Sequence, residues 1–309
     1  MKFGGIATST SKNREKIASI IEKINHKKIL LVVSAMGRVG FPYATDTLLD
    51  LIDSANITIK EENRLLSIGE IISSIVMSNL LNSKKIKAYA LSLKEIGLYK
   101  KDKFVFENSA ITELFNNYNV LIVPGFIALD NKENVITLKR GGGDLSACIL
   151  TNFLNCAKTY LFKDVSGVLP FVSQGYNNIK PIKYLSYLEA LALTNIGYNI
   201  IQKDALIYAK ESNLEIVVTN YVNGKIGTVI GKNELNKHII GMNFTKNTIK
   251  IATLFPELAD EQIKKNFSNN HLFFKNFKMK KDYVEYEFGI NQIQLAKKML
   301  IDTYFKDYL

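Results

Sequence analysis

The chain has 309 residues, of which 47% are hydrophobic, and this size leaves room for a sizeable core and a second domain. We expect a cytoplasmic protein with no membrane partner, because the first residues lack the apolar segment of a signal peptide and no apolar run is long enough to cross a bilayer. The net charge of +11 permits nucleic-acid binding, but the lysines are spread along the chain and form no stripe with aromatic residues, so we expect no nucleic-acid partner.

Residues 1–231 alternate short apolar runs with amphipathic segments. The strands are predicted at 29–34, 87–91, 120–124, 135–138, 159–162 and 215–220. The helices are predicted at 11–25, 62–82, 108–118, 144–156, 185–195 and 202–212. This alternation predicts an α/β fold with a mainly parallel sheet that helices cover on both faces, so that ligands bind at the carboxyl ends of the strands.

A glycine turn with a cation lies near the start of residues 1–231. Lys2 precedes Gly4 and Gly5, and a hydroxyl residue among 9–11 is placed to cap the next helix. Glycines let the backbone approach a ligand closely, and a helix N-terminus attracts anions. This turn therefore predicts an anion site.

A second glycine turn lies between the strand at 135–138 and the helix at 144–156. It contains Arg140 and three glycines at 141–143, and Asp144 follows them. The guanidinium of Arg140 suits a carboxylate or a phosphate. A turn that only reverses the chain direction is the alternative.

Two isolated acids also lie at strand or helix ends. Glu70 falls in the first turn of an apolar helix, where it either binds a ligand or complements the helix dipole. Asp164 follows the strand at 159–162, where it either faces a ligand or forms an Asx turn.

The two cysteines, Cys148 and Cys156, are both placed on the helix at 144–156, about 12 Å apart and too far for a disulfide. The three histidines are scattered, so we expect no metal site made by the protein.

Residues 232–309 differ in composition and are richer in Asn, Lys and Phe. Strand-like segments at 241–254 and 272–288 alternate with helix-like segments at 259–266 and 292–305. We therefore expect two domains, 1–231 and 232–309, of which the second is a small α+β module.

The chain resembles the aspartate kinases of the amino-acid-kinase superfamily, over essentially all of residues 1–231. The matching segments are KFGG at 2–5, VVSAMGR at 32–38, PYATDTLL at 42–49, LLSIGEIISS at 65–74, VPGFIA at 123–128, TLKRGGGDLSA at 137–147, KDVSGV at 163–168 and GTVI at 227–230. Their order and spacing look closest to the monofunctional enzymes of Gram-positive bacteria. The resemblance implies a three-layer αβα amino-acid-kinase fold, followed by a short ACT-like domain for regulation or dimerisation.

The resemblance also implies ATP-dependent phosphorylation of the β-carboxylate of L-aspartate to 4-phospho-L-aspartate, the first step toward lysine, threonine, methionine and diaminopimelate. Mg²⁺ is then held mainly by the ATP phosphates, and a homodimer forms through the C-terminal domain. The implied catalytic residues are Lys2 and Asp144, of which Asp144 orients Lys2 or the metal. The implied substrate-binding residues are Ser34, Thr45, Glu70, Arg140, Gly141 and Gly142, and the implied ATP-binding residues are Lys2, Gly4, Gly5, Lys163 and Asp164.

Several positions depart from the family pattern. Ile6 and Ala7 replace a hydroxyl pair, Gly143 replaces a serine, Lys163 replaces a threonine, and Asn199 replaces a lysine expected on an ATP phosphate. The losses cluster on the ATP side, although Lys163 or Lys203 can supply the missing charge. An alternative therefore stays open, in which the chain is a catalytically impaired homologue that binds aspartate or regulates a partner.

Overall fold

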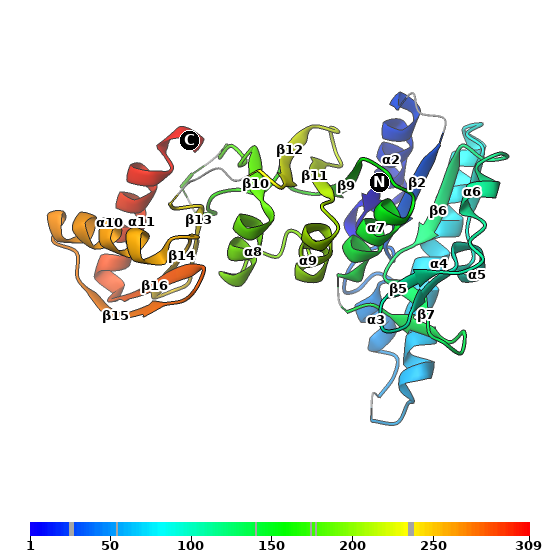
Figure 1. The fold of residues 1–309 in the computed structure, drawn as a ribbon, viewed down its shortest axis with the longest axis horizontal. Coiled ribbons are helices and arrows are strands. Elements are labelled where there is room, and N and C mark those ends of the chain that lie inside the picture. Colours follow the sequence, from blue (N-terminus) through cyan, green and yellow to red (C-terminus); the bar gives the residue numbers. More distant parts are fainter. Residues whose placement is uncertain (25–27, 54, 140, 174, 177, 234–237) are drawn as a thin grey trace. The chain divides into compact units, whose positions relative to one another are not determined.

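The computed structural model of the chain describes residues 1–24, 28–53, 55–139, 141–173, 175–176, 178–233 and 238–309 (Figure 1). The chain folds into two compact units. The first unit contains Met1–Val165 and Ile216–Lys225, and the second contains Ser166–Glu215 and Ile226–Leu309.

A parallel sheet forms the centre of the first unit. In the order β11-β9-β1-β2-β6-β3, its strands are Glu215–Asn220, Lys158–Lys163, Lys2–Phe3, Ile29–Val33, Val120–Pro124 and Ala88–Ala90. The pairs β9–β1, β1–β2, β2–β6 and β6–β3 are all parallel. These buried runs of Val, Ile and Leu are typical of a sheet covered on both faces. The predicted mainly parallel sheet is confirmed.

Three long helices cover this sheet (Figure 1). They are α2 (Ser11–Lys23), α4 (Ile59–Ser83) and α7 (Gly142–Phe153). Apolar side chains of α2 and α4 share one core with Phe3, Leu31 and Val33, while α7 packs against β1, β2 and β9. The backbone N–H of Asn13 donates to Thr10 Oγ1 at 3.2 Å, so one of the predicted hydroxyl residues caps α2. The predicted three-layer arrangement is confirmed.

The strand predicted at 135–138 does not join the parallel sheet. It forms β8 (Val135–Thr137), which pairs antiparallel with β7 (Ile127–Leu129). Only five residues connect the two strands, and Asp130 accepts two backbone N–H bonds within that connection. A connection this short permits only antiparallel pairing. With β4 (Leu98–Lys100) and β5 (Phe104–Phe106), these strands make a separate small sheet.

Two helix predictions in this unit were wrong in extent. The helix predicted at 108–118 forms only one turn, α6 (Ile111–Leu114), because the following asparagines close tight turns. The helix α7 ends at Phe153, so Cys156 lies outside it and is exposed, whereas Cys148 is buried in α7. Short helices α1 (Gly5–Thr8), α3 (Thr45–Leu49) and α5 (Leu93–Ile96) complete the unit.

The helix α4 is long and apolar enough to cross a membrane by length and composition, so the prediction that no apolar run is long enough was wrong. Half of its apolar window is nevertheless buried inside the protein, where it packs against β3, β6 and β8. Because a core helix passes the same test, this is weak grounds for a membrane span.

The second unit begins with a small parallel pair. The strand β10 (Tyr184–Ser186) pairs with β12 (Ile226–Gly231), beside the helices α8 (Tyr187–Asn195) and α9 (Lys203–Glu211). The remaining elements make the C-terminal module. They are β13 (Gly241–Phe244), β14 (Thr248–Ala252), α10 (Pro256–Asn269), β15 (Phe274–Met279), β16 (Tyr283–Phe288) and α11 (Ile290–Tyr304).

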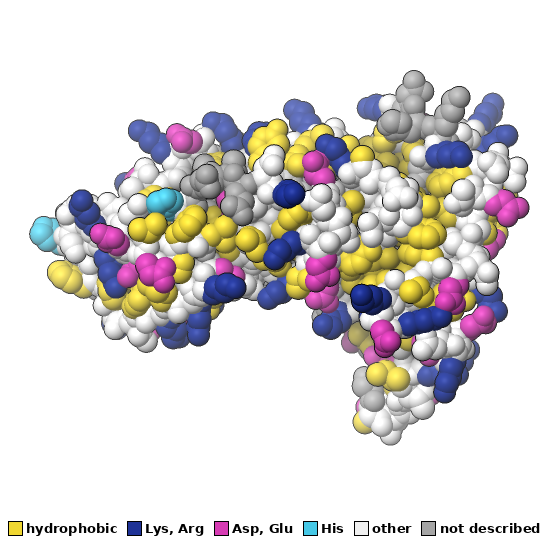
Figure 2. Space-filling view, viewed as in Figure 1, with side chains coloured by type: hydrophobic (Ala, Val, Ile, Leu, Met, Phe, Trp, Pro, Cys, Tyr) yellow, Lys and Arg dark blue, Asp and Glu magenta, His cyan; other side chains and the backbone are white. Residues whose placement is uncertain are grey.

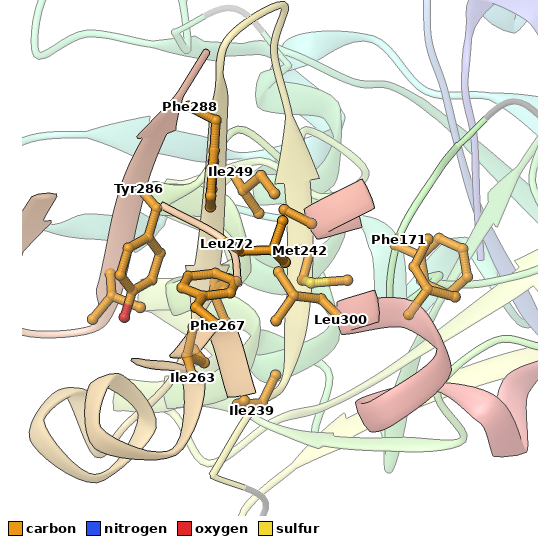
Figure 3. Close-up of a cluster of buried hydrophobic side chains, with 14 of the residues drawn as sticks. Phe171, Ile239, Met242, Ile249, Ile263, Phe267, Leu272, Tyr286, Phe288 and Leu300 are labelled. Atoms are coloured by element: carbon orange, nitrogen blue, oxygen red, sulfur yellow. The ribbon is translucent and has the colours of Figure 1, made fainter. Parts of the chain in front are cut away.

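The core of the C-terminal module is strongly aromatic (Figure 3). Phe267 on α10 meets Tyr286 and Phe288 of β16 edge-on, with ring centroids 5.1 and 5.3 Å apart. The sheet is antiparallel, in the order β13-β14-β16-β15. The small α+β region predicted here is confirmed, while the boundary between residues 231 and 232 stays a prediction.

Charged side chains are dispersed on the face drawn in Figure 2, where lysines and arginines lie among acidic and apolar side chains. The expectation of no nucleic-acid partner stays a prediction.

Candidate active site

Two lysines share one buried carboxylate in the first unit. Lys2 Nζ lies 3.0 Å from Asp144 Oδ1, and Lys163 Nζ donates to Asp144 Oδ2 at 2.7 Å. The side chains of Lys2, Lys163 and Asp144 are only 8%, 16% and 4% exposed. Two ammonium groups and one carboxylate sum to a formal charge of +1, held away from bulk water.

Strand register explains why the two lysines meet. On β1 and β9, Lys2 is opposite Leu161 and Phe3 is opposite Phe162. Because side chains alternate along a strand, Lys163 points to the same face as Leu161 and Lys2. The rings of Phe3 and Phe162 stack on the other face at 4.2 Å. Asp144 enters from the first turn of α7, after Gly141 turns the chain with a φ of 85°.

The three charges change one another's titration. Burial raises the pKa of Asp144, but Lys163 and Lys2 outweigh it and hold that pKa well below its usual range. Burial and the charge of Lys2 lower the pKa of Lys163, and Asp144 only partly offsets them. Asp144 is therefore ionised at neutral pH, while Lys163 gives up its proton more readily than an ordinary lysine.

Gly143 leaves room for Lys2. A Cβ atom at this position would lie 3.0 Å from Lys2 Cε and 3.2 Å from Ser34 Oγ, which is tighter than ordinary contact. At Gly4 a Cβ would lie 3.7 Å from Lys2 Nζ. Lys2 therefore lies against the backbone of Gly143, which carries no side chain, at the start of α7 and close to Ser34 at the end of β2.

Glu70 lies buried in the interior of α4 and is only 2% exposed. The prediction that it falls in the first turn of its helix was wrong, because α4 begins at Ile59, so Glu70 does not complement the helix dipole there. Burial raises its pKa to about 7, although backbone hydrogen bonds, including one from Ala35, and the charge of Lys2 lower it. Its Oε2 atom has no hydrogen-bond partner among the described residues. An unpaired buried carboxylate oxygen favours a cationic ligand.

The remaining predicted residues are placed as follows. Thr45 begins α3, which packs against α4, and Gly69 of α4 is held against the Tyr43 carbonyl. Asp164 follows β9, is exposed, and acts to raise the pKa of Lys163.

Arg140 lies outside the described residues, between Lys139 and the glycine turn. Gly141 and Gly142 start α7, and Gly4 and Gly5 start α1.

The hydroxyl groups of Thr8 and Ser9, near the first glycine turn, donate hydrogen bonds to backbone carbonyls. Thr8 is buried and donates to the Gly5 carbonyl at 3.1 Å, and Ser9 donates to the Ile6 carbonyl at 2.8 Å. In the second unit, Lys203 Nζ donates to Asn195 Oδ1 at 2.8 Å. Of the two lysines considered as replacement cations, Lys163 is the one that joins Lys2 at Asp144. The sequence carried no signal for this contact, because it depends on the register between β1 and β9.

The described residues contain no group of three His, Cys, Asp or Glu side chains that could hold a metal ion. Both oxygens of Asp144 already contact lysines. The protein side of the site therefore does not fit a resident divalent metal, and the site's positive charge comes from ammonium groups.

Residues 1–220 match the family model described as "Amino acid kinase family". The chain belongs to the amino acid kinase family. Kinases of this family use ATP, so the buried cations lie in a protein built for phosphoryl transfer. The fold of solved members agrees. Aspartokinase III of E. coli, in complex with lysine and aspartate, has a TM-score of 0.67 at 16% identity, over 97% of this chain and 82% of that one.

Relatives of known sequence include aspartokinase 1 of Bacillus subtilis, 29% identical over 97% of this chain and 80% of that protein. An aspartokinase of Helicobacter pylori is 29% identical over 74% of this chain and 58% of its own length. Among solved structures, the UMP kinase of Bacillus anthracis has a TM-score of 0.53 at 18% identity, over 75% of this chain and 94% of that one.

Proposed function

We propose that the chain is an aspartate kinase, which transfers the γ-phosphoryl group of ATP to the β-carboxylate of L-aspartate. The observation that carries this proposal is the buried pair of lysines on Asp144, beside the glycine turn that begins α7. The names of the most similar relatives support the choice of acceptor. The products are 4-phospho-L-aspartate and ADP.

The reaction needs cations more than it needs a base. The β-carboxylate of aspartate is already ionised at neutral pH, so its oxygen attacks the γ-phosphorus without losing a proton. The new oxygen–phosphorus bond forms as the bond to the β,γ-bridging oxygen breaks, and its electron pair leaves with ADP. Negative charge on the phosphoryl oxygens is then the main obstacle, which positive groups in a shielded site offset.

Glu70 is proposed to bind the ammonium group of aspartate, because its buried Oε2 has no hydrogen-bond partner among the residues that the structure describes. Ser34, Thr45, Gly141 and Gly142 are proposed as further aspartate contacts. Arg140 is proposed for the α-carboxylate from outside the described residues.

On the ATP side, Lys2, Gly4, Gly5, Lys163 and Asp164 are proposed to bind the nucleotide. Mg²⁺, when bound, offsets phosphate charge, and we propose that it arrives on the ATP phosphates, because the described part of the chain offers no cluster of ligands for it. No step of the reaction above depends on a protein-bound metal.

We further propose that residues 232–309 form one ACT-like domain through which a homodimer assembles, and that the protein acts in the cytoplasm. The product would feed the synthesis of lysine, threonine, methionine and diaminopimelate.

The test is to incubate the purified chain with ATP, Mg²⁺ and L-aspartate in hydroxylamine, which traps an acyl phosphate as a hydroxamate. We expect hydroxamate and ADP in equal amounts, and none when L-asparagine replaces L-aspartate. Titration of ATP by calorimetry, with and without Mg²⁺, accompanies the assay. Absence of both hydroxamate and ATP binding at millimolar ATP would reject the proposal. Aspartate binding without turnover would favour the impaired homologue.

A further inference from the structure

We propose that Lys163 is a second catalytic cation, which contacts the transferring phosphoryl group beside Lys2. This inference rests on the proposed function, because it assigns a role within that same phosphoryl transfer. It goes further than nucleotide binding, since it places the charge of Lys163 on the group that moves.

The charge balance of the site is the first reason. Lys2 alone neutralises Asp144 formally, so the second ammonium adds a positive charge that the carboxylate does not match. Burying an unmatched charge is costly, and a protein that needed only a neutral pair would lack it. The charges of Glu70 and Asp164 act on Lys2 and Lys163, respectively, but neither carboxylate forms an ion pair with these lysines among the described residues. The excess charge is therefore available to an anion.

Donor geometry is the second reason. Asp144 presents one oxygen to each lysine, so it holds the two ammonium groups on its two sides. An ammonium group has three N–H donors, and the carboxylate contact uses one of them on each lysine. The other N–H groups can donate to the non-bridging oxygens of a phosphoryl group, on which negative charge accumulates during transfer.

The position of the pair is the third reason. Lys2 and Lys163 lie on neighbouring parallel strands and point to the face on which α7 begins. Gly143 presents bare backbone there, close to Lys2. The two ammonium groups and the side-chain-free backbone of Gly143 thus lie in one small region of the first unit.

In the proposed step Lys163 keeps its proton. It donates a hydrogen bond to a non-bridging oxygen of the γ-phosphoryl group while the bond from aspartate forms and the bond to ADP breaks. The lysine itself makes and breaks no covalent bond.

The test compares Lys163→Met, Lys163→Arg and the matched control Lys158→Met, whose side chain is exposed on the same strand β9. We expect Lys163→Met to lower kcat by about 10²–10³-fold with KM for aspartate nearly unchanged, as for loss of one transition-state donor. Lys163→Arg should recover part of that loss, and Lys158→Met should match the wild type.

The pH profile separates catalysis from packing. Because the pKa of Lys163 is lowered, the wild-type kcat should fall at high pH as this lysine loses its proton. In Lys163→Arg the fall should move to higher pH, since a guanidinium stays charged. If Lys163→Met unfolds at a much lower temperature than the wild type, its loss of activity cannot be assigned to catalysis. The pH profile of Lys163→Arg then decides whether Lys163 acts on the phosphoryl group.

Two results overturn the inference while leaving the proposed function intact. One is an active wild type whose kcat changes less than threefold in Lys163→Met, and the other is an unmoved high-pH limb in Lys163→Arg. A wild type that forms no hydroxamate from aspartate rejects the proposed function itself, and the role of Lys163 with it.

Discussion

The first unit and the C-terminal module treat buried polar groups in opposite ways. Lys2, Asp144 and Glu70 are buried in the first unit, and Glu70 keeps an oxygen without a partner among the described residues. The core of the C-terminal module is made of apolar and aromatic side chains, and the Tyr286 hydroxyl donates to Asp260. The buried charged groups of the first unit therefore lower its stability but supply groups for chemistry, whereas the apolar core of the module stabilises its fold.

The largest expected effect tests the module. Phe267→Ala removes the ring that meets Tyr286 and Phe288, and should lower the free energy of unfolding by about 3–5 kcal/mol. Phe273→Ala, whose side chain is 70% exposed, should change it by less than about 0.5 kcal/mol. Denaturant titration measures both. If the module only stabilises the fold, Phe267→Ala and the wild type should form hydroxamate at equal rates per folded molecule. A lower kcat in Phe267→Ala would contradict this view.

The next effect tests the site. Lys2→Met should lower kcat by about 10³-fold, or roughly 4 kcal/mol, because it removes a cation from the phosphoryl group. Stability should change little, since Asp144 keeps Lys163 as its partner. Lys12→Met, on the exposed side of α2, is the control. If Lys2→Met unfolded the protein instead, Lys2 would be a structural residue.

A smaller effect is expected at the glycine beside Lys2. Gly143→Ser places a Cβ 3.0 Å from Lys2 Cε, so Lys2 must move, and kcat should fall about tenfold. Gly231→Ser is the matched control, because the nearest atom to a Cβ there lies at 3.8 Å. A rate for Gly143→Ser equal to that of the control would show that Lys2 adjusts freely.

The smallest effect concerns Glu70 and pH. Its pKa is raised to about 7, so the carboxylate that would bind the substrate ammonium is lost as pH falls through that value. KM for aspartate should rise roughly fivefold between pH 7 and pH 6. In Glu70→Gln the dependence should vanish while KM stays high. A pH-independent KM in the wild type would exclude Glu70 from substrate binding.

The same shift has a consequence for folding. A carboxyl group with a raised pKa stabilises the fold below its unfolded value of 4.5, and that contribution is lost as pH rises through about 7. Glu70→Gln should therefore be more stable than the wild type at pH 8, as thermal unfolding would show.

Sequence periodicity predicted most of the parallel sheet because its strands are buried on both faces. The strand predictions at 120–124 and 215–220 agree with β6 and β11. The prediction for 135–138 failed in its pairing, since partner and direction depend on connection length and not on apolar pattern. The helix predicted at 108–118 failed because turn-forming asparagines end it early.

The site was predictable by residue type but not by contact. The glycine turns and the lysines beside them were visible in the sequence, and their roles stay predictions. The meeting of Lys163 with Asp144 depends on the register between β1 and β9, which periodicity alone does not fix. For the same reason Gly143 looked like the loss of a hydroxyl, although in space it makes room for Lys2.

The register of β1 and β9 also bears on how such a site can change over generations. Position 163 already points at Asp144, so one amino-acid replacement there adds or deletes a cation without moving the main chain.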